Sequence, residues 1–144
     1  MTQRNMAFFM KGNAKPIQEL EEVVTRRYLD EEGEPVPFVF RPLGSERVEE
    51  LRDECTKRIP ARKGTPAREE FDARRFNIKV GIETTVFPNF KDAELLKSYG
   101  VTDPVDVVPK VLETAGEMGA WFEAMQKAND FDDDFEELIE DAKN

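Results

Sequence analysis

The residues that could do chemistry in this chain are mainly carboxylates, because its 144 residues include no histidine and a single cysteine, Cys55. Without histidine there is no imidazole base, no Ser-His or Cys-His pair and no imidazole metal ligand. One thiol cannot build a cysteine-rich zinc site. The sequence also contains no phosphate-binding loop and no G-x-G-x-x-G run. We therefore expect no catalytic residues, no cofactor and no metal, and a protein that works by binding another protein.

The acidic run at residues 130–134 offers the nearest match to a metal site. Its alternating acids resemble the first positions of an EF-hand loop, and Asp141 falls at the twelfth. The sixth position of such a loop needs glycine, but Phe135 stands there. Phe135 also belongs to the apolar stripe of a helix predicted over about 133–142. We interpret the run as the acidic start of that helix, where negative charge suits the helix dipole.

Aromatic and methionine side chains are the candidate partner-binding residues, because methionine adapts its shape and tryptophan is a frequent interface anchor. They form two groups: Phe8, Phe9 and Met10 near the N-terminus, and Trp121, Phe122 and Met125 further along. The first group lies on an arm, residues 1–15, in which Gly12 and Asn13 stop any short helix. For both groups, packing into the core is the alternative interpretation.

The net charge of −10 is unevenly distributed. Residues 1–56 carry −4, residues 57–79 carry +5 and residues 80–144 carry −11. An acidic chain repels nucleic acid and anionic membranes, and no stretch approaches the length of a spanning helix. The basic island lacks the interleaved aromatics of a nucleic-acid site. Its Pro- and Gly-punctuated part, residues 60–68, is predicted to be a flexible basic loop.

A β-hairpin is the clearest element in the sequence. Residues 21–29 are rich in β-branched side chains, and Val36, Phe38 and Phe40 alternate onto one face of a second strand over 36–41. Residues 30–35 between them are typical of a turn, with Gly33 available for a positive φ. Because a lone hairpin is marginal in water, it must pack on helices or pair with another strand.

Five to six mostly short helices follow in the prediction. The first runs from an N-cap at Ser45 to about Ile59 and buries Cys55 in its apolar stripe, and the second begins at Asp72 and ends before Pro88. Apolar residues surround this second helix, so we expect it to be central and buried. Shorter helices are predicted over 91–99, ending at Gly100, and from Asp103-Pro104, with a break or kink at Pro109. A capping box of Thr114 and Glu117 begins a helix that ends near Ala128.

An ordered set of short motifs resembles one protein family. The motifs are Ala7-Phe8-Phe9 with Asn13-Ala14, residues 26–31 with 33–38, Leu51-Arg52 with Cys55-Thr56-Lys57, Val86-Phe87-Pro88, residues 91–95 with 98–101, and the closing Ala142-Lys143-Asn144. Each motif is weak alone, but their order along almost the whole chain resembles the XkdN-like tail assembly chaperones of tailed phages and defective prophages.

This resemblance implies a non-enzymatic phage tail assembly chaperone. Such a protein would bind the tape measure protein and keep it soluble in the cytoplasm of the host bacterium, and would be absent from the mature virion. The tail tube protein and a frameshifted longer form are further candidate partners, and a homo-oligomer is permitted. The alternative is a structural tail or connector component that is retained in the virion.

The predicted fold class is α+β, with an N-terminal β-hairpin packed on a bundle of about five to six mostly short helices. Residues 1–144 would form a single tail-assembly-chaperone domain with a mobile arm at 1–15. The chain lacks an export signal and has one cysteine, so the cytoplasm is the expected compartment.

Overall fold

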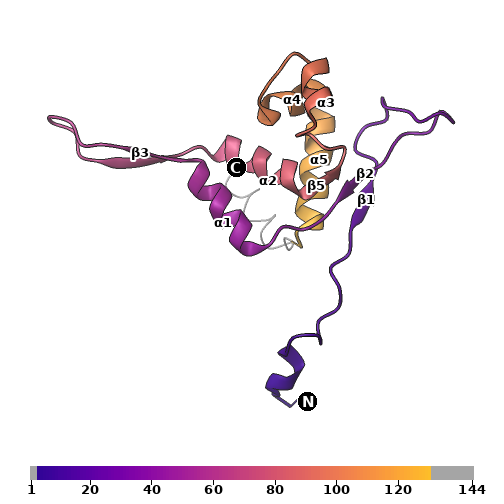
Figure 1. The fold of residues 1–144 in the computed structure, drawn as a ribbon, viewed down its shortest axis with the longest axis horizontal. Coiled ribbons are helices and arrows are strands. Elements are labelled where there is room, and N and C mark those ends of the chain that lie inside the picture. The colour runs from indigo at the N-terminus through magenta and orange to yellow at the C-terminus, as the bar shows by residue number, and fades with distance from the viewer. Residues whose placement is uncertain (1–2, 131–144) are drawn as a thin grey trace.

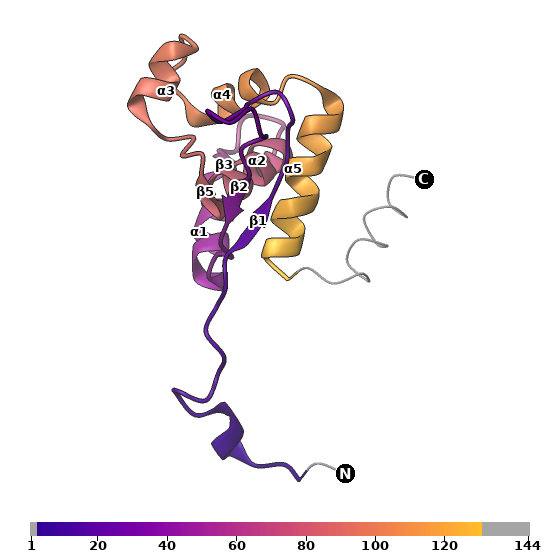
Figure 2. The same ribbon diagram turned by 90° about the vertical axis from the view of Figure 1, so that its right-hand side faces the viewer.

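The computed structural model describes residues 3–130, and the helix predicted over about 133–142 and the EF-hand-like acids beyond Asp130 lie outside them. The described part is an α+β body with projecting segments (Figure 1). The N-terminal arm points down in this view, and a long two-stranded hairpin that contains β3 points to the left. In the perpendicular view the arm leads away from the body, while helix α5 runs along its flank (Figure 2). The predicted α+β class is confirmed.

A three-stranded antiparallel sheet lies in the body, in the order β1-β2-β5. Strand β1 (Leu20–Glu22) pairs with β2 (Phe38–Phe40), which pairs in turn with β5 (Thr85–Phe87). Phe38 and Phe40 share one face and are both buried, as their alternation predicts. The third strand was not predicted. It supplies the additional strand that an isolated hairpin needs.

The predicted N-terminal hairpin is present, but only its two ends are regular. The register joins Leu20 to Phe40, and an isolated bridge joins Leu29 to Pro35 beside the turn. Gly33 adopts φ +82° there and donates its N–H to the Asp30 carbonyl. The intervening residues 23–28 form no ladder, and three of their side chains bond to the helices instead: Thr25 and Arg27 to Glu117 of α5, and Tyr28 to the Val111 carbonyl of α4 (Pro104–Val111).

A second hairpin replaces the predicted end of the first helix. Helix α1 spans Ser45–Glu54, with Gly44 and not Ser45 at the N-cap position. Strand β3 (Thr56–Ile59) then pairs with β4 (Arg68–Phe71). The prediction of a helix to Ile59 was therefore wrong at its C-terminal end. Cys55 lies at the junction, where it is buried as expected, and burial raises the pKa of its thiol.

Helix α2 (Ala73–Thr84) is the central helix of the body and contacts α1, α4, α5 and β5. Asp72 caps it by accepting a hydrogen bond from the Arg75 N–H, as predicted. The helix ends before Thr85 and not at Pro88, so Val86 lies on a strand and is half exposed. The predicted placement of Val86 on a buried helix was wrong.

The three remaining helices match their predicted signals. Helix α3 (Ala93–Ser98) is followed by Gly100 at φ +69°. Helix α4 (Pro104–Val111) begins at the Asp103 cap and contains Pro109. Helix α5 (Ala115–Ala128) begins with the predicted capping box. A short 3-10 helix (Met6–Phe9) on the arm completes the described helical elements.

The core lies between the sheet, α2, α4 and α5. Its largest fully buried side chains are Trp121, Phe40, Phe90, Leu51, Ile78 and Leu112. Trp121 donates its indole N–H to the Thr85 hydroxyl at 2.9 Å and meets Phe90 edge to face. This packing connects α5 to strand β5, whose residues were predicted to be the end of the second helix.

Candidate partner-binding surfaces

The N-terminal arm presents its aromatic side chains to solvent. Phe8 is 55%, Phe9 84% and Met10 58% exposed, and every residue from 3 to 19 is exposed. The arm therefore does not fold back onto the core, which was the alternative interpretation. Large apolar side chains gathered in the open are typical of a surface that another molecule covers.

The tip of the arm has a defined local structure. Asn5 accepts a hydrogen bond from the Ala7 N–H, and Asn13 donates one to the Ala7 carbonyl. Gly12 turns the chain at φ +98°, as the predicted stop requires. We call residues Met6–Met10 the aromatic tip. Because these bonds hold it folded before any contact, a partner would pay less conformational entropy to bind it.

The second predicted group lies in the core and not on the surface. Trp121 is fully buried, Met125 is buried, and Phe122 is partly buried against both of them and the core around Val80. These three residues therefore follow the alternative interpretation of the sequence, which was core packing. Of the six predicted partner-binding residues, Phe8, Phe9 and Met10 are exposed, and the other three pack in the core.

An apolar pocket of about 230 Å³ opens between the sheet, the first hairpin and helix α3. Its walls include Tyr28, Val36, Phe38, Phe87, Leu95 and Tyr99. Phe87 at the rim is half exposed on β5, which is an end strand of the sheet. No local pattern in the sequence indicates this pocket, because its walls come from separate segments that only the fold brings together.

Polar contacts fix one wall of this pocket. The Tyr28 hydroxyl donates to the Val111 carbonyl at 2.7 Å and lies 3.3 Å from the Tyr99 hydroxyl. Burial, followed by the contact with Tyr99, raises the pKa of Tyr28 to about 12. Tyr28 therefore stays a neutral hydrogen-bond donor across the physiological range, and the wall keeps its shape.

Glu117 of α5 binds Arg27, the residue that precedes Tyr28 in the chain. Arg27 donates to both of its carboxylate oxygens, at 3.0 and 3.1 Å, and Thr25 and Thr114 also donate to it. These bonds, that from Arg27 first, lower the pKa of Glu117 to about 2. The capping box was visible in the sequence. Its pairing with Arg27 was not, because the two residues lie 90 positions apart.

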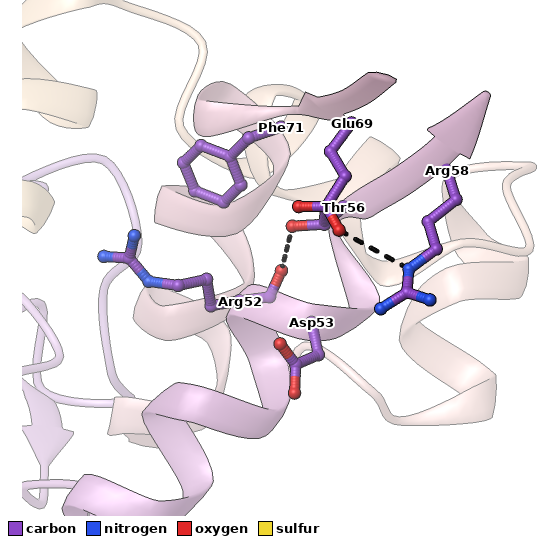
Figure 3. Close-up of a pocket in the computed structure, with 6 residues that line it drawn as sticks. All are labelled: Arg52, Asp53, Thr56, Arg58, Glu69 and Phe71. Atoms are coloured by element: carbon purple, nitrogen blue, oxygen red, sulfur yellow. Dashed lines mark hydrogen bonds and ion pairs between the residues drawn. The ribbon is translucent and has the colours of Figure 1, made fainter. Parts of the chain in front are cut away.

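A larger and more polar groove lies at the base of the projecting β3–β4 hairpin (Figure 3). Arg52 and Asp53 of α1 line it together with Thr56, Arg58, Glu69 and Phe71 of the hairpin. The Arg52 guanidinium stacks over the Phe71 and Phe76 rings at 5.3 and 5.4 Å, and Arg58 pairs with Glu69 at 3.4 Å. Four of its six lining residues are charged, so the groove has less apolar surface to offer than the pocket.

Residues 60–67 form the far turn of this hairpin. Arg62 and Thr65 exchange backbone hydrogen bonds of 2.8 and 2.9 Å, and Gly64 adopts φ +86°. All residues from 60 to 70 are exposed. The mobility predicted for residues 60–68 stays a prediction. Their position at the end of a projecting hairpin was not expected.

Two kinds of site find no match within residues 3–130. No group of three or more acidic, cysteine or histidine side chains is arranged to hold a metal ion. None of the helices in this range is both long and apolar enough to cross a membrane. What this part of the molecule does present is an exposed aromatic arm and an apolar pocket on a small α+β body.

Comparisons with known proteins identify the family. The model of the phage XkdN-like tail assembly chaperone family matches residues 6–143. The uncharacterized protein YqbN of Bacillus subtilis (strain 168) is 41% identical over 142 residues, 97% of this chain and 93% of that protein. The phage-like element PBSX protein XkdN of the same strain is 34% identical over 142 residues, 97% of this chain and 94% of that protein.

A solved structure supports the same assignment. The crystal structure of the protein YqbN superposes with a TM-score of 0.76 at 34% identity, covering 91% of this chain and all of that one. The chain belongs to the XkdN-like phage tail assembly chaperone family. The family predicted from the ordered motifs is confirmed.

Proposed function

We propose that this chaperone binds the tape measure protein and keeps it soluble while the phage tail assembles. It acts by binding and not by catalysis, in the cytoplasm of the host bacterium, and is absent from the mature virion. The observation that carries this proposal is the aromatic tip, whose apolar side chains are exposed and already held in a folded turn.

Physical chemistry links this tip to such a client. A long helical protein that has not yet assembled exposes apolar stripes, which promote aggregation. Phenylalanine and methionine side chains on a flexible arm can cover such stripes and adapt to their shape. The net charge of −10 would keep the complex soluble. The covering must be reversible, because the tail tube later replaces it.

The test is co-expression with the tape measure protein, followed by a solubility assay and a pull-down. We expect the tape measure protein to become soluble and to co-purify with the wild-type chain. The double variant Phe8→Asp/Phe9→Asp should lose both effects. Val23→Asp, which also changes a half-exposed apolar residue but lies off the arm, is the matched control and should keep them.

Two results would contradict the proposal. One is an insoluble tape measure protein in the presence of the wild-type chain. The other is stoichiometric recovery of this chain from purified virions by mass spectrometry, which would favour a structural tail or connector component instead.

A further inference from the structure

The chain carries two apolar surfaces, the exposed aromatic tip and the pocket beside helix α3. We propose that the aromatic tip, Met6–Met10, docks into the apolar pocket of a second copy of this chain, so that the protein self-associates through its arms. This inference goes beyond the proposed function, because it requires no client. It can therefore fail or succeed independently of tape measure binding.

The size and chemistry of the pocket match side chains and not a whole ligand. At about 230 Å³ it is smaller than the roughly 300–1,000 Å³ of sites that enclose small molecules. Its walls are aromatic and aliphatic, and Phe38, Tyr99 and the half-exposed Phe87 offer ring faces and edges. An inserted phenylalanine would find the tilted and edge-to-face contacts that aromatic pairs prefer.

The arm is long and extended enough for its tip to reach another molecule. Residues 11–19 between the aromatic tip and β1 contain no helix or strand and are fully exposed. Nine or ten extended residues span up to about 35 Å. The arm leaves the body at β1 and runs away from helix α3, which forms a wall of the pocket (Figures 1 and 2). Filling its own pocket would require the arm to reverse direction at Leu20.

Charge favours the chain itself as the occupant. Residues 1–18 contain three basic residues, Arg4, Lys11 and Lys15, and no acidic one. The turn that continues from the Tyr28 and Val36 wall holds four exposed acidic residues and no basic one, namely Asp30, Glu31, Glu32 and Glu34. A basic arm that enters a pocket beside an acidic turn gains electrostatic complementarity, within a protein that is otherwise strongly acidic.

Self-association and client binding would then use the same side chains. An arm held in a neighbouring pocket cannot contact the tape measure protein at the same time. The exchanged arm would therefore protect its apolar side chains until a client competes for them. The first test is consequently made on the chaperone alone.

The primary experiment is sedimentation velocity of the full chain over a wide range of concentration. We expect reversible, concentration-dependent association that weakens as salt is added, because part of the attraction is between exposed charges. Phe9→Asp on the arm and Phe87→Asp at the pocket rim should each weaken it by roughly 10- to 30-fold, as for loss of an interface anchor. Val86→Asp, the neighbouring residue on β5, is the matched control and should leave it unchanged.

A charge exchange tests the match between arm and turn. Lys11→Glu/Lys15→Glu and Glu31→Lys/Glu32→Lys should each weaken association. Combining the four substitutions in one chain should restore it, because both partners of the attraction are then reversed. Failure of the combination to restore association would show that the arm does not lie beside this turn, and would overturn the proposed docking.

Mixed isotope labelling shows which copy the arm enters. One chain carries a nitroxide at Gln3→Cys in a Cys55→Ala background and has no 15N. It is mixed with a second chain that is labelled with 15N and carries no nitroxide. We expect the amide signals of Tyr28 and Leu95 to broaden in the 15N-labelled copy. The control sample is a chain that carries both the nitroxide and 15N, diluted into chains that carry neither. If the signals broaden only in this sample, the arm lies in the pocket of its own chain, and the proposal is overturned.

Two further outcomes would also overturn it. The first is a monomer at every concentration up to about 500 µM, which would place any dissociation constant in the millimolar range or above. The second is association that Phe9→Asp and Phe87→Asp leave intact. Circular dichroism of each variant confirms that the fold is retained, and both substituted residues are already half exposed or more in the native structure.

Discussion

Two aromatic groups of similar composition have opposite environments in this protein. Phe8 and Phe9 stand in solvent, whereas Trp121 lies at the centre of the core. Residue type alone could not separate them, because phenylalanine, tryptophan and methionine serve cores and interfaces equally well. The difference comes from what lies opposite: Trp121 meets Gly81 and Thr85 from other elements, and those contacts have no local signal in the sequence.

Gly81 is required by the close approach of Trp121. A Cβ built on Gly81 would lie 2.6 Å from the Cζ2 atom of the indole ring, well inside van der Waals contact. Alanine favours a helix over glycine, but here we expect Gly81→Ala to destabilise the protein by about 1–3 kcal/mol through overpacking.

Gly119→Ala is the matched control for this substitution. Gly119 is also helical, and a Cβ there meets nothing within 4 Å. We expect it to stabilise the protein by roughly 0.5–1 kcal/mol. Urea unfolding of the two variants measures both effects, and equal changes of the same sign would contradict the packing argument.

Glu117 makes the stability of the protein sensitive to acid. Its pKa falls from 4.5 to about 2 in the folded protein, so the stabilisation is fully present above pH 4.5 and is lost as the pH falls toward 2. Glu117→Gln should cost roughly 1–3 kcal/mol at pH 7, and this difference from wild type should shrink between pH 4.5 and 2. Urea unfolding across this range provides the measurement. A difference that stays constant with pH would exclude the ionised carboxylate as the cause, and Glu123→Gln on the exposed side of α5 is the control.

At the scale of elements, the sequence predicted what local signals encode. Caps at Asp72, Asp103 and Thr114 and the glycine at position 100 placed four helix ends correctly, because each acts within one helical turn. Strands β3 and β5 were missed. Their residues continue the apolar pattern of the helices that precede them. They are extended because β5 pairs with β2, which is distant in sequence, and β3 pairs with β4, whose residues are mostly charged.

The candidate site was predictable to the same extent. The arm and the stop at Gly12 follow from local residues, but the exposure of Phe8 and Phe9 does not, because packing onto the core was also an open interpretation of the sequence. The pocket was not, since its walls come from segments near Tyr28, Phe38, Phe87 and Tyr99. Their meeting depends on the Glu117 and Arg27 pair and on the unpredicted strand β5.

The far turn of the β3–β4 hairpin should be dispensable for folding. Residues 60–70 are exposed, and the charged pairs along it, such as Arg58 with Glu69, are exposed ion pairs that contribute little. Replacing residues 60–67 by an Asn-Gly turn should change the free energy of unfolding by less than about 0.5 kcal/mol. Thermal and urea unfolding measure this, and a larger loss would show that the turn supports the body.

At the scale of the whole molecule, the body and the arm are energetically separate. Residues 3–19 are exposed throughout, so a chain that begins at Gln18 loses no buried apolar surface from the described part of the arm. The truncated chain should unfold at the same temperature as the full chain in dilute solution. A drop of several degrees, measured by calorimetry, would mean that the arm packs on its own body.

The burial of Trp121 also gives the protein a built-in optical label. The chain has one tryptophan, so its ultraviolet emission comes from a single indole, shielded from water and bonded to Thr85. Emission at short wavelength, and its resistance to an aqueous quencher such as iodide, therefore report on the core alone. A variant of the arm that keeps this spectrum but loses its client has lost recognition and not structure, and one spectrum in the same cuvette makes that distinction.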